Sequence, residues 1–261
     1  MNEDIEKGLV NNLAVPVYED VLRPFGKEIS KGLASVARSV NTGLYLMEDC
    51  VNATVSVIRM TGEKLALLPP EEITFSNPRV ALQALDQAKF LVNEIQIQEL
   101  FSQLIASSLN ENKKSFIHPA FIEIIKQLQS DEALILKYMA RQDSHRSGSG
   151  PTIDISIKSG DENFSSESII PEFNLIAEDA GCIYPEKCSS YFENLKRIGL
   201  IAHHSGTPYS QDQHLRIFES EKAKAVYESE KYPVGSAATW KFGCYYFTGF
   251  GREFAQACIS T

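Results

Sequence analysis

The feature that most constrains this chain is a long amphipathic stripe near its start. Apolar residues recur there at spacings of three and four, the spacing of one face of an α-helix: Leu22, Phe25, Ile29, Leu33, Val36, Val40, Leu44 and Met47. The pattern repeats every eleven residues, which favours a straight or slightly right-handed helix over a left-handed coiled coil. It extends toward Leu65, and Pro69 and Pro70 must end the helix because proline cannot donate the backbone hydrogen bond.

The face opposite this stripe is basic. It carries Arg23, Lys27, Lys31 and Arg38, and the only acidic residue between positions 21 and 47 is Glu28. One interpretation is that the stripe packs on the protein's other helices while the basic face is solvated. The other is that the stripe inserts into a membrane interface or an oligomeric bundle, with the cationic groups attracted to anionic lipid.

The segment after this helix has the pattern of a helical body. Asn77 and Pro78 form a helix start, and the run 80–109 is expected to be helical throughout. The apolar face of that run comprises Leu85, Val92, Ile95, Leu100, Leu104 and Ile105. After a polar break, His118 and Pro119 begin a short helix, and Ser130 with Asp131 caps a further one.

The Ser/Gly-rich stretch 142–151 is the best candidate for a linker, because it has too little apolar surface to offset the entropy of ordering. We therefore expect an N-terminal amphipathic segment at 1–67, a helical body at 68–141, the linker, and a C-terminal module at 152–261.

The C-terminal module alternates short strands and helices. The pattern predicts a strand at 153–157, helices at 170–180 and 185–198, an extended stretch from Leu200, a strand at 244–247 and a last helix capped by Thr248. Gly199 is expected to stop the second helix. The fold class is thus mainly α, with a winged-helix-like α+β module at the C-terminal end.

Composition narrows the class of protein further. The 261 residues are 43% hydrophobic and 23% charged, as in soluble globular domains rather than disordered or membrane-spanning chains. The start of the chain lacks the features of a signal peptide, and the five cysteines form no CxxC pair. We expect a cytoplasmic protein with reduced thiols, whose N-terminal helix allows a peripheral position at the inner membrane.

Charge argues against nucleic acid as the main partner. The net charge is −9, opposite in sign to that of most polyanion-binding proteins. The predicted helix 185–198 carries Lys187, Lys196 and Arg197 against Glu186 and Glu193, which is little for contacting phosphates. A winged-helix DNA-binding regulator is therefore the alternative, and a protein partner or a homo-oligomer is preferred.

No recognisable catalytic motif occurs in the sequence: there is no phosphate loop, dinucleotide fingerprint, zinc helix or nucleophile elbow. His203, His204 and His214 could join Cys182 and Cys188 as zinc ligands, but the spacing fits no common site. His118 precedes Pro119, which favours helix capping. We expect no enzyme and assign no catalytic, cofactor-binding or metal residue and no cofactor, although an unrecognised nuclease or other hydrolase is a third hypothesis.

Five blocks of the sequence resemble the bacterial abortive-infection alpha (Abi-alpha) family: 99–108 (ELFSQLIASS), 118–128 (HPAFIEIIKQL), 130–133 (SDEA), 191–201 (YFENLKRIGLI), and 247–254 (FTGFGREF) with Cys258. The resemblance covers about residues 60–260. The Ser/Gly linker and a polar insertion after His204 depart from the family pattern. Asn194 and Arg252 are the polar residues of these blocks to test first.

The resemblance implies a largely helical prokaryotic protein associated with phage exclusion, and it carries over no catalytic residues. Our leading hypothesis is a phage-defence protein of the abortive-infection kind that acts without catalysis. In it the body and the C-terminal module sense or scaffold, and the N-terminal helix acts at a membrane or in self-association. Packing of the apolar stripe against the helical body before infection would keep such a protein inactive.

Overall fold

A computed structural model describes residues 44–74, 78–142, 148–158, 167–206, 211–227 and 237–259. The described chain is mainly helical, with one small curled antiparallel sheet of four strands. It divides into two compact units. The first contains residues up to Ala133 together with Glu253–Ser260, and the second contains Leu134–Arg252. None of the helices in the described ranges is long and apolar enough to cross a membrane.

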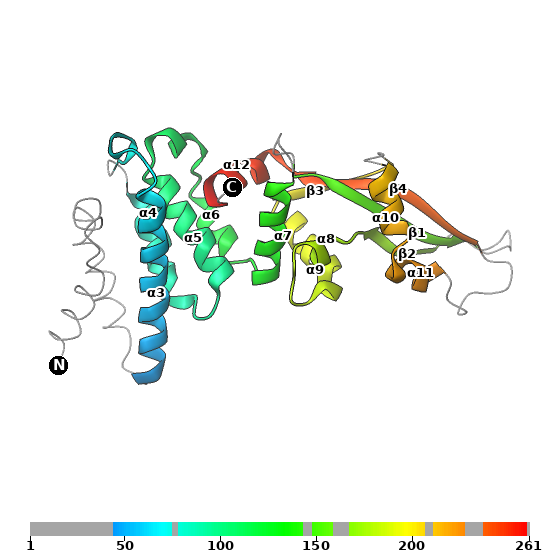
Figure 1. The fold of residues 1–261 in the computed structure, drawn as a ribbon, viewed down its shortest axis with the longest axis horizontal. Helices are drawn as coiled ribbons and strands as arrows, with labels where there is room; N and C mark the ends of the chain where they lie inside the picture. The colour runs from blue at the N-terminus through cyan, green and yellow to red at the C-terminus, as the bar shows by residue number, and fades with distance from the viewer. Residues whose placement is uncertain are drawn as a thin grey trace. The chain divides into compact units, whose positions relative to one another are not determined.

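The first unit is built from the later part of α12 (Gly249–Cys258), which is red in Figure 1, and from helices that run from blue to green. They are α3 (Leu44–Leu65), the 3₁₀ turn η1 (Pro70–Glu72), α4 (Arg79–Gln87), η2 (Ala88–Phe90), α5 (Ile95–Ser108), η3 (Glu111–Phe116), α6 (Ala120–Ile125) and the beginning of α7 (Ser130–Arg141). Helix α5 is the centre of the core, because nearly all of its residues are buried. The ring of Phe254 meets that of Phe121 edge-on, at 5.4 Å between centroids.

Helix α3 is the described end of the predicted amphipathic helix. Residues 22–43, which carry most of the stripe and the basic face, lie outside the described residues. The helix ends at Leu65, ahead of Pro69, as predicted. Val57, Ile58 and Leu65 are buried, and the helix packs against α5. In this part of the stripe the apolar face is therefore used for packing on the protein's own helices.

The prediction of one continuous helix over 80–109 is wrong. Helix α4 passes into η2, which ends at Phe90, and α5 begins only at Ile95. Between them Asn93 adopts φ 61°, a left-handed conformation that asparagine tolerates better than most residues. The buried Gln98 side chain donates to the carbonyl of Leu91 at 2.8 Å, which compensates for the broken helix. Ile95, expected on the apolar face, is consequently 60% exposed.

The helix starts after this break were predicted correctly. His118 Nδ1 accepts a hydrogen bond from the amide of Ala120 at 3.1 Å, so this histidine acts as a helix cap. Helix α7 begins at Ser130, as expected. Its cap differs in detail, because the Glu132 carboxylate accepts from the amide of Gln129 at 2.8 Å.

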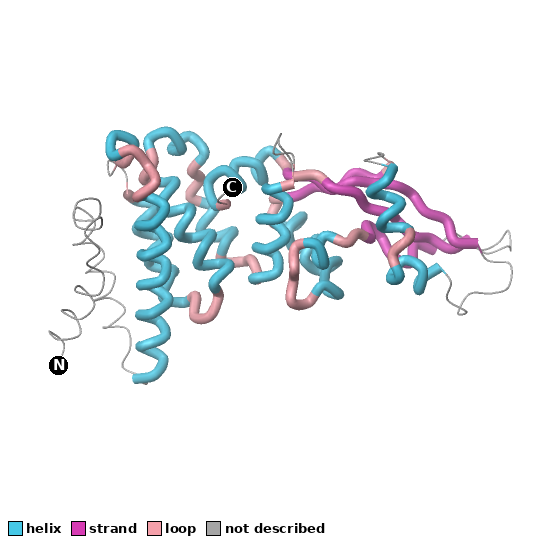
Figure 2. The backbone as a smooth tube through the Cα atoms, in the orientation of Figure 1, coloured by secondary structure: helices cyan, strands magenta, loops and turns pink. Residues whose placement is uncertain are grey.

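The second unit carries the sheet, which is magenta in Figure 2. Its elements are the rest of α7, β1 (Gly150–Lys158), β2 (Glu167–Phe173), α8 (Ile176–Asp179), η4 (Pro185–Lys187), α9 (Cys188–Arg197), β3 (Ile201–Ser205), α10 (Gln211–Phe218), α11 (Glu221–Tyr227), β4 (Ala237–Phe247) and the first turn of α12 (Gly249–Cys258). The strand order is β2-β1-β4-β3, and all neighbouring strands are antiparallel.

Most predicted elements of this unit are present. Strand β1 contains 153–157, Gly199 ends α9 with φ 78°, and the Thr248 hydroxyl accepts from the amide of Gly251 at 2.8 Å to cap α12. The predicted helix 170–180 is wrong in its first part, because β2 continues to Phe173 and α8 is a single turn. Helices α10 and α11 were not predicted, and the expected linker overlaps β1 from Gly150.

The two faces of the sheet differ in character. Ile153 and Ile155 of β1 point to one face, where they pack with Ile217 of α10 and Ala223 of α11. Because side chains alternate along a strand, Thr152 and Asp154, which precede these two isoleucines, belong to the opposite face. There Phe192 of α9 packs edge-on against Tyr245 of β4, at 5.2 Å between ring centroids. One face is thus apolar, and the other combines an aromatic contact with polar side chains.

Candidate functional site

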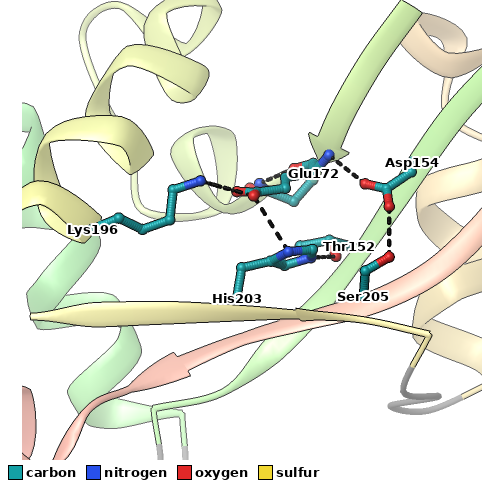
Figure 3. Close-up of polar contacts among 7 residues, drawn as sticks. Thr152, Asp154, Glu172, Lys196, His203 and Ser205 are labelled. Carbon is teal, nitrogen blue, oxygen red and sulfur yellow. Dashed lines mark hydrogen bonds and ion pairs between the residues drawn. The ribbon is translucent and has the colours of Figure 1, made fainter. Parts of the chain in front are cut away.

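A polar cluster occupies the sheet face on which α9 packs (Figure 3). It consists of Thr152 and Asp154 from β1, Glu172 from β2, Lys196 from α9, and His203 and Ser205 from β3. Hydrogen bonds and ion pairs join these side chains into two connected groups that meet at Glu172.

Glu172 lies in an irregular stretch of β2. Opposite the two-residue step from Ile153 to Ile155 in β1, β2 advances three residues, from Phe173 back to Ile170. The extra residue lets both Phe173 and Ile170 pack on the apolar face despite their spacing of three. At this bulge Glu172 adopts φ 54°, a backbone conformation that is rare for residues other than glycine.

The Asp154 carboxylate holds the bulge in place. Its Oδ1 accepts from the backbone amide of Glu172 at 2.8 Å, and its Oδ2 accepts from the hydroxyl of Ser205 at 2.8 Å. Strained residues of this kind persist only where neighbouring contacts fix them. The bulge directs the Glu172 side chain to the polar face rather than into the core.

The carboxylate of Glu172 is the hub of the cluster. Lys196 Nζ lies 2.8 Å from Oε1 and 2.7 Å from Oε2, so the ammonium contacts both oxygens. His203 Nδ1 lies 3.3 Å from Oε1. The side chains of Glu172 and His203 are 22% and 10% exposed, so solvent screens their interaction less than it would at an open surface.

His203 also reaches Thr152, on a strand that is not its neighbour. Strand β4 lies between them, and Gly243 is the β4 residue paired with Thr152. The distance from His203 Nε2 to Thr152 Oγ1 is 2.8 Å. A Cβ atom at Gly243 would lie 2.7 Å from each of these two atoms. The contact therefore depends on the absence of a side chain at this position.

The contacts run from the Thr152 hydroxyl to the His203 imidazole and on to the Glu172 carboxylate. A catalytic nucleophile, its general base and the carboxylate that orients the base are arranged in the same way. An imidazole with its proton on Nδ1 donates to Glu172 and accepts from Thr152. However, Thr152 is 0% exposed, so a substrate has no access to its hydroxyl. As arranged here, the network joins strands β1, β2 and β3 rather than presenting a nucleophile.

A pocket of about 340 Å³ lies beside the cluster. Glu172 and Lys196 belong to its wall, and the remaining lining residues come from β2, η4, α9 and the neighbourhood of α8 and α11. Its apolar lining includes Ile170, Phe173 and Phe192. Pockets of this size with an apolar lining and a few polar groups are typical of small-molecule sites.

A partly buried thiol, that of Cys188, and a second ion pair also line this pocket. Burial, and secondarily the charge of Glu178, raises the pKa of Cys188 to about 12, so this thiol is protonated and unreactive at neutral pH. Glu178 forms an ion pair with Lys222 through Oε1. Its other oxygen, Oε2, is buried and has no hydrogen-bond partner among the described residues.

The histidines considered as zinc ligands do not come together. His203 belongs to the polar cluster, whereas the neighbouring His204 is exposed. His214 is buried on α10, with Nε2 3.1 Å from the carbonyl oxygen of Gly243. In the described ranges, no group of three or more His, Cys, Asp and Glu side chains is arranged to hold a metal ion.

The two polar residues selected from the sequence have local structural roles. Asn194 Oδ1 accepts from the Arg197 guanidinium at 2.6 and 3.1 Å, one turn further along α9. Arg252 Nη1 donates to the carbonyl of Phe247 at 3.0 Å. Neither belongs to the polar cluster. Glu172, Asp154 and Thr152 were missed, because no local motif links residues so far apart in the sequence.

Comparison with protein families assigns the chain to one of them. The family model described as "Abortive infection alpha" matches residues 53–258, which is most of the chain. Searches of curated proteins and of solved structures each found no match. The matched range begins within α3 and includes the helices that follow it in the first unit and the whole polar cluster. The chain therefore belongs to the abortive infection alpha family.

Proposed function

We propose that this protein serves phage defence by abortive infection as a non-catalytic sensor and scaffold in the bacterial cytoplasm. The main support for the proposal is that the side chains of the polar cluster bind one another. Thr152 is fully buried and the Glu172 carboxylate is engaged by Lys196 and His203. A satisfied polar network of this kind fixes a unique arrangement of strands, which suits recognition.

The N-terminal amphipathic segment is the proposed effector. Its apolar stripe and basic face give it the chemistry of a membrane-surface helix or of a helix that associates with other copies. Support for a silent state comes from α3, where the end of the same stripe packs against α5. Release of such packing after infection would free the stripe for lipid or for a second copy.

Phage plating on bacteria that carry the gene tests the function. We expect protection of the culture at low multiplicity of infection and death of infected cells at high multiplicity. A catalytically inert sensor should keep this protection in a Thr152→Val variant that still folds, because no step uses the hydroxyl. Loss of protection with retained folding would instead favour the hypothesis of an unrecognised hydrolase.

Lipid vesicles test the effector role of the N-terminal segment. Full-length protein should bind or permeabilise anionic vesicles more than neutral ones, and replacing Lys27 and Lys31 with Glu should weaken that effect. If the full chain and a peptide of residues 17–67 neither bind nor leak vesicles, the membrane version is wrong. Concentration-dependent self-association would then be the version to test, by sedimentation.

The alternative is a DNA-binding regulator with a winged-helix-like module. Helix α9 precedes β3, which pairs antiparallel with β4, although α10 and α11 lie between these two strands in the chain. Against it, Lys196 is engaged by Glu172, which leaves α9 with less positive charge for phosphates. Salt-dependent DNA binding that is lost when Lys196 and Arg197 are replaced would support this alternative, and no binding at low salt would exclude it.

A further inference from the structure

We infer that the pocket beside the polar cluster binds a small organic cation, a guanidinium or ammonium group carried on an apolar body. The inference deepens the proposed function, on which its biological meaning rests, because it names the class of ligand that the second unit would sense. Binding itself is a property of the purified protein and is measured independently of phage defence.

The shape and lining of the pocket supply the first part of the argument. A volume of about 340 Å³ accommodates a small molecule or one long side chain of a peptide. Ile170, Phe173 and Phe192 contribute apolar surface, and Pro171 and Pro185 add more. Transfer of a hydrocarbon group from water to such a lining is favourable, so the ligand carries an apolar part.

The charges around the pocket favour a cationic ligand. Four carboxylates and two ammonium groups line it. Lys196 is paired with Glu172, and Lys222 with Glu178. The two remaining carboxylates, Glu186 and Glu193, have no ion pair with any described residue. The field inside the pocket is therefore negative, and low-dielectric walls concentrate such a field.

The two carboxylates of Glu186 and Glu193 lie within reach of a ligand that is bound to the apolar lining. Glu186, Ser189 and Glu193 are spaced by three and four residues along η4 and α9, so they share one side of this helical segment, and all three are exposed. A ligand with its apolar part on Phe173 and Phe192 can thus place a cationic group at these carboxylates. Glu178 Oε2 is buried and has no hydrogen-bond partner among the described residues, so it offers the same wall a further acceptor.

Calorimetry or protein-observed NMR with three matched probes tests the inference. The probes are phenethylguanidine, its neutral isostere phenethylurea, and the anion 4-phenylbutanoate. We expect binding in the order guanidine, urea, carboxylate, with the guanidine affinity falling as salt is raised. Equal binding of the urea and the guanidine, or no binding of the guanidine at millimolar concentration, would overturn the inference.

Two pairs of variants test whether the cation binds in this pocket. Ser189→Trp should fill the pocket and abolish binding, whereas Ser190→Trp, an equally exposed neighbour that does not line the pocket, should not. Glu193→Gln should weaken binding by up to about fivefold, whereas Glu219→Gln, in the turn after α10, should leave it unchanged. Binding that survives in a folded Ser189→Trp variant would show that the site lies elsewhere.

A capped Ala-Arg-Ala tripeptide distinguishes the two sources of such a cation. If the peptide competes with phenethylguanidine, the pocket accepts an arginine side chain of a protein partner. If it does not compete while the small probe binds, the ligand is a free small molecule. The plating experiment separates these outcomes from the proposed function: a Ser189→Trp protein that loses the cation but still protects cells refutes only the sensing role of the pocket.

Discussion

His203 and Thr152 meet across the full width of a strand, with His203 Nε2 2.8 Å from Thr152 Oγ1 over the α-carbon of Gly243. A Cβ at that position would lie 2.7 Å from both atoms and 2.9 Å from the backbone carbonyl of His204. The backbone oxygen cannot move aside as a flexible side chain could. Gly243 is therefore required for close approach of its neighbours, and not for an unusual backbone angle.

Gly243→Ala should consequently destabilise the protein. We expect a loss of about 1–3 kcal/mol in the free energy of unfolding, the usual cost of overpacking, measured by urea denaturation. Gly249→Ala is the matched control, because the nearest atom to its added Cβ is 4.0 Å away. The control should change stability by less than about 1 kcal/mol. Equal effects of the two substitutions would contradict the proposed contact across β4.

Lys196 and its neighbour Arg197 should respond differently to replacement by methionine. Lys196→Met leaves the Glu172 carboxylate, 22% exposed, without its ammonium partner, and we expect a loss of about 1–2 kcal/mol in the free energy of unfolding. Arg197 is exposed, and its guanidinium donates to Asn194 on the same helix, so Arg197→Met at this solvated position should cost less than about 0.5 kcal/mol. Thermal and urea unfolding of both variants give the comparison, and similar losses would show that Glu172 does not depend on Lys196.

The partly buried thiol of Cys188 should react slowly in the folded protein. Burial raises its pKa to about 12 from a usual value of 9.0, so at pH 8.5 the folded chain exposes almost no thiolate there. Iodoacetamide should label Cys188 slowly in buffer and rapidly in urea, as read by mass spectrometry of its peptide. Labelling at equal rates in both conditions would mean that this side chain is not enclosed.

The same shift gives a dependence of stability on pH. The folded chain keeps a proton that the unfolded chain releases, so the contribution of Cys188 is fully present below pH 9.0 and is lost as pH rises toward about 12. Cys188→Ala should therefore flatten the decline of stability in this alkaline range relative to the parent protein. An unchanged slope would assign the decline to other groups.

Local signals in the sequence were sufficient for much of this fold. Helix starts at His118, Ser130 and Thr248 were predicted because capping chemistry involves residues only two or three positions apart. Strand β2 was missed for a physical reason: its bulge places Ile170 and Phe173 on one face at a spacing of three, which is the spacing of a helix. Helices α10 and α11 were missed because few of their residues are apolar and buried.

The candidate site was much harder to predict. Thr152, Glu172 and His203 meet only because the sheet order places β4 between β1 and β3 and because a glycine lies at the crossing. The adjacent histidines drew attention to His203 but suggested zinc, whereas the structure gives it a threonine and a glutamate as partners. Long-range pairing of strands, which sequence periodicity does not contain, determines this arrangement.

Thr248 provides a final test, because its hydroxyl connects the end of one helix with the start of another. Oγ1 accepts from the amide of Gly251 at 2.8 Å, which caps α12, and donates to the carbonyl of Gly199 at 2.6 Å, just after α9. Thr248→Val keeps the shape of the side chain but removes both hydrogen bonds, so we expect a loss of about 1–2 kcal/mol in the free energy of unfolding. Thr248→Ser keeps the hydroxyl and should retain most of the stability. If valine were tolerated as well as serine, packing of the methyl group rather than hydrogen bonding would account for threonine at this position.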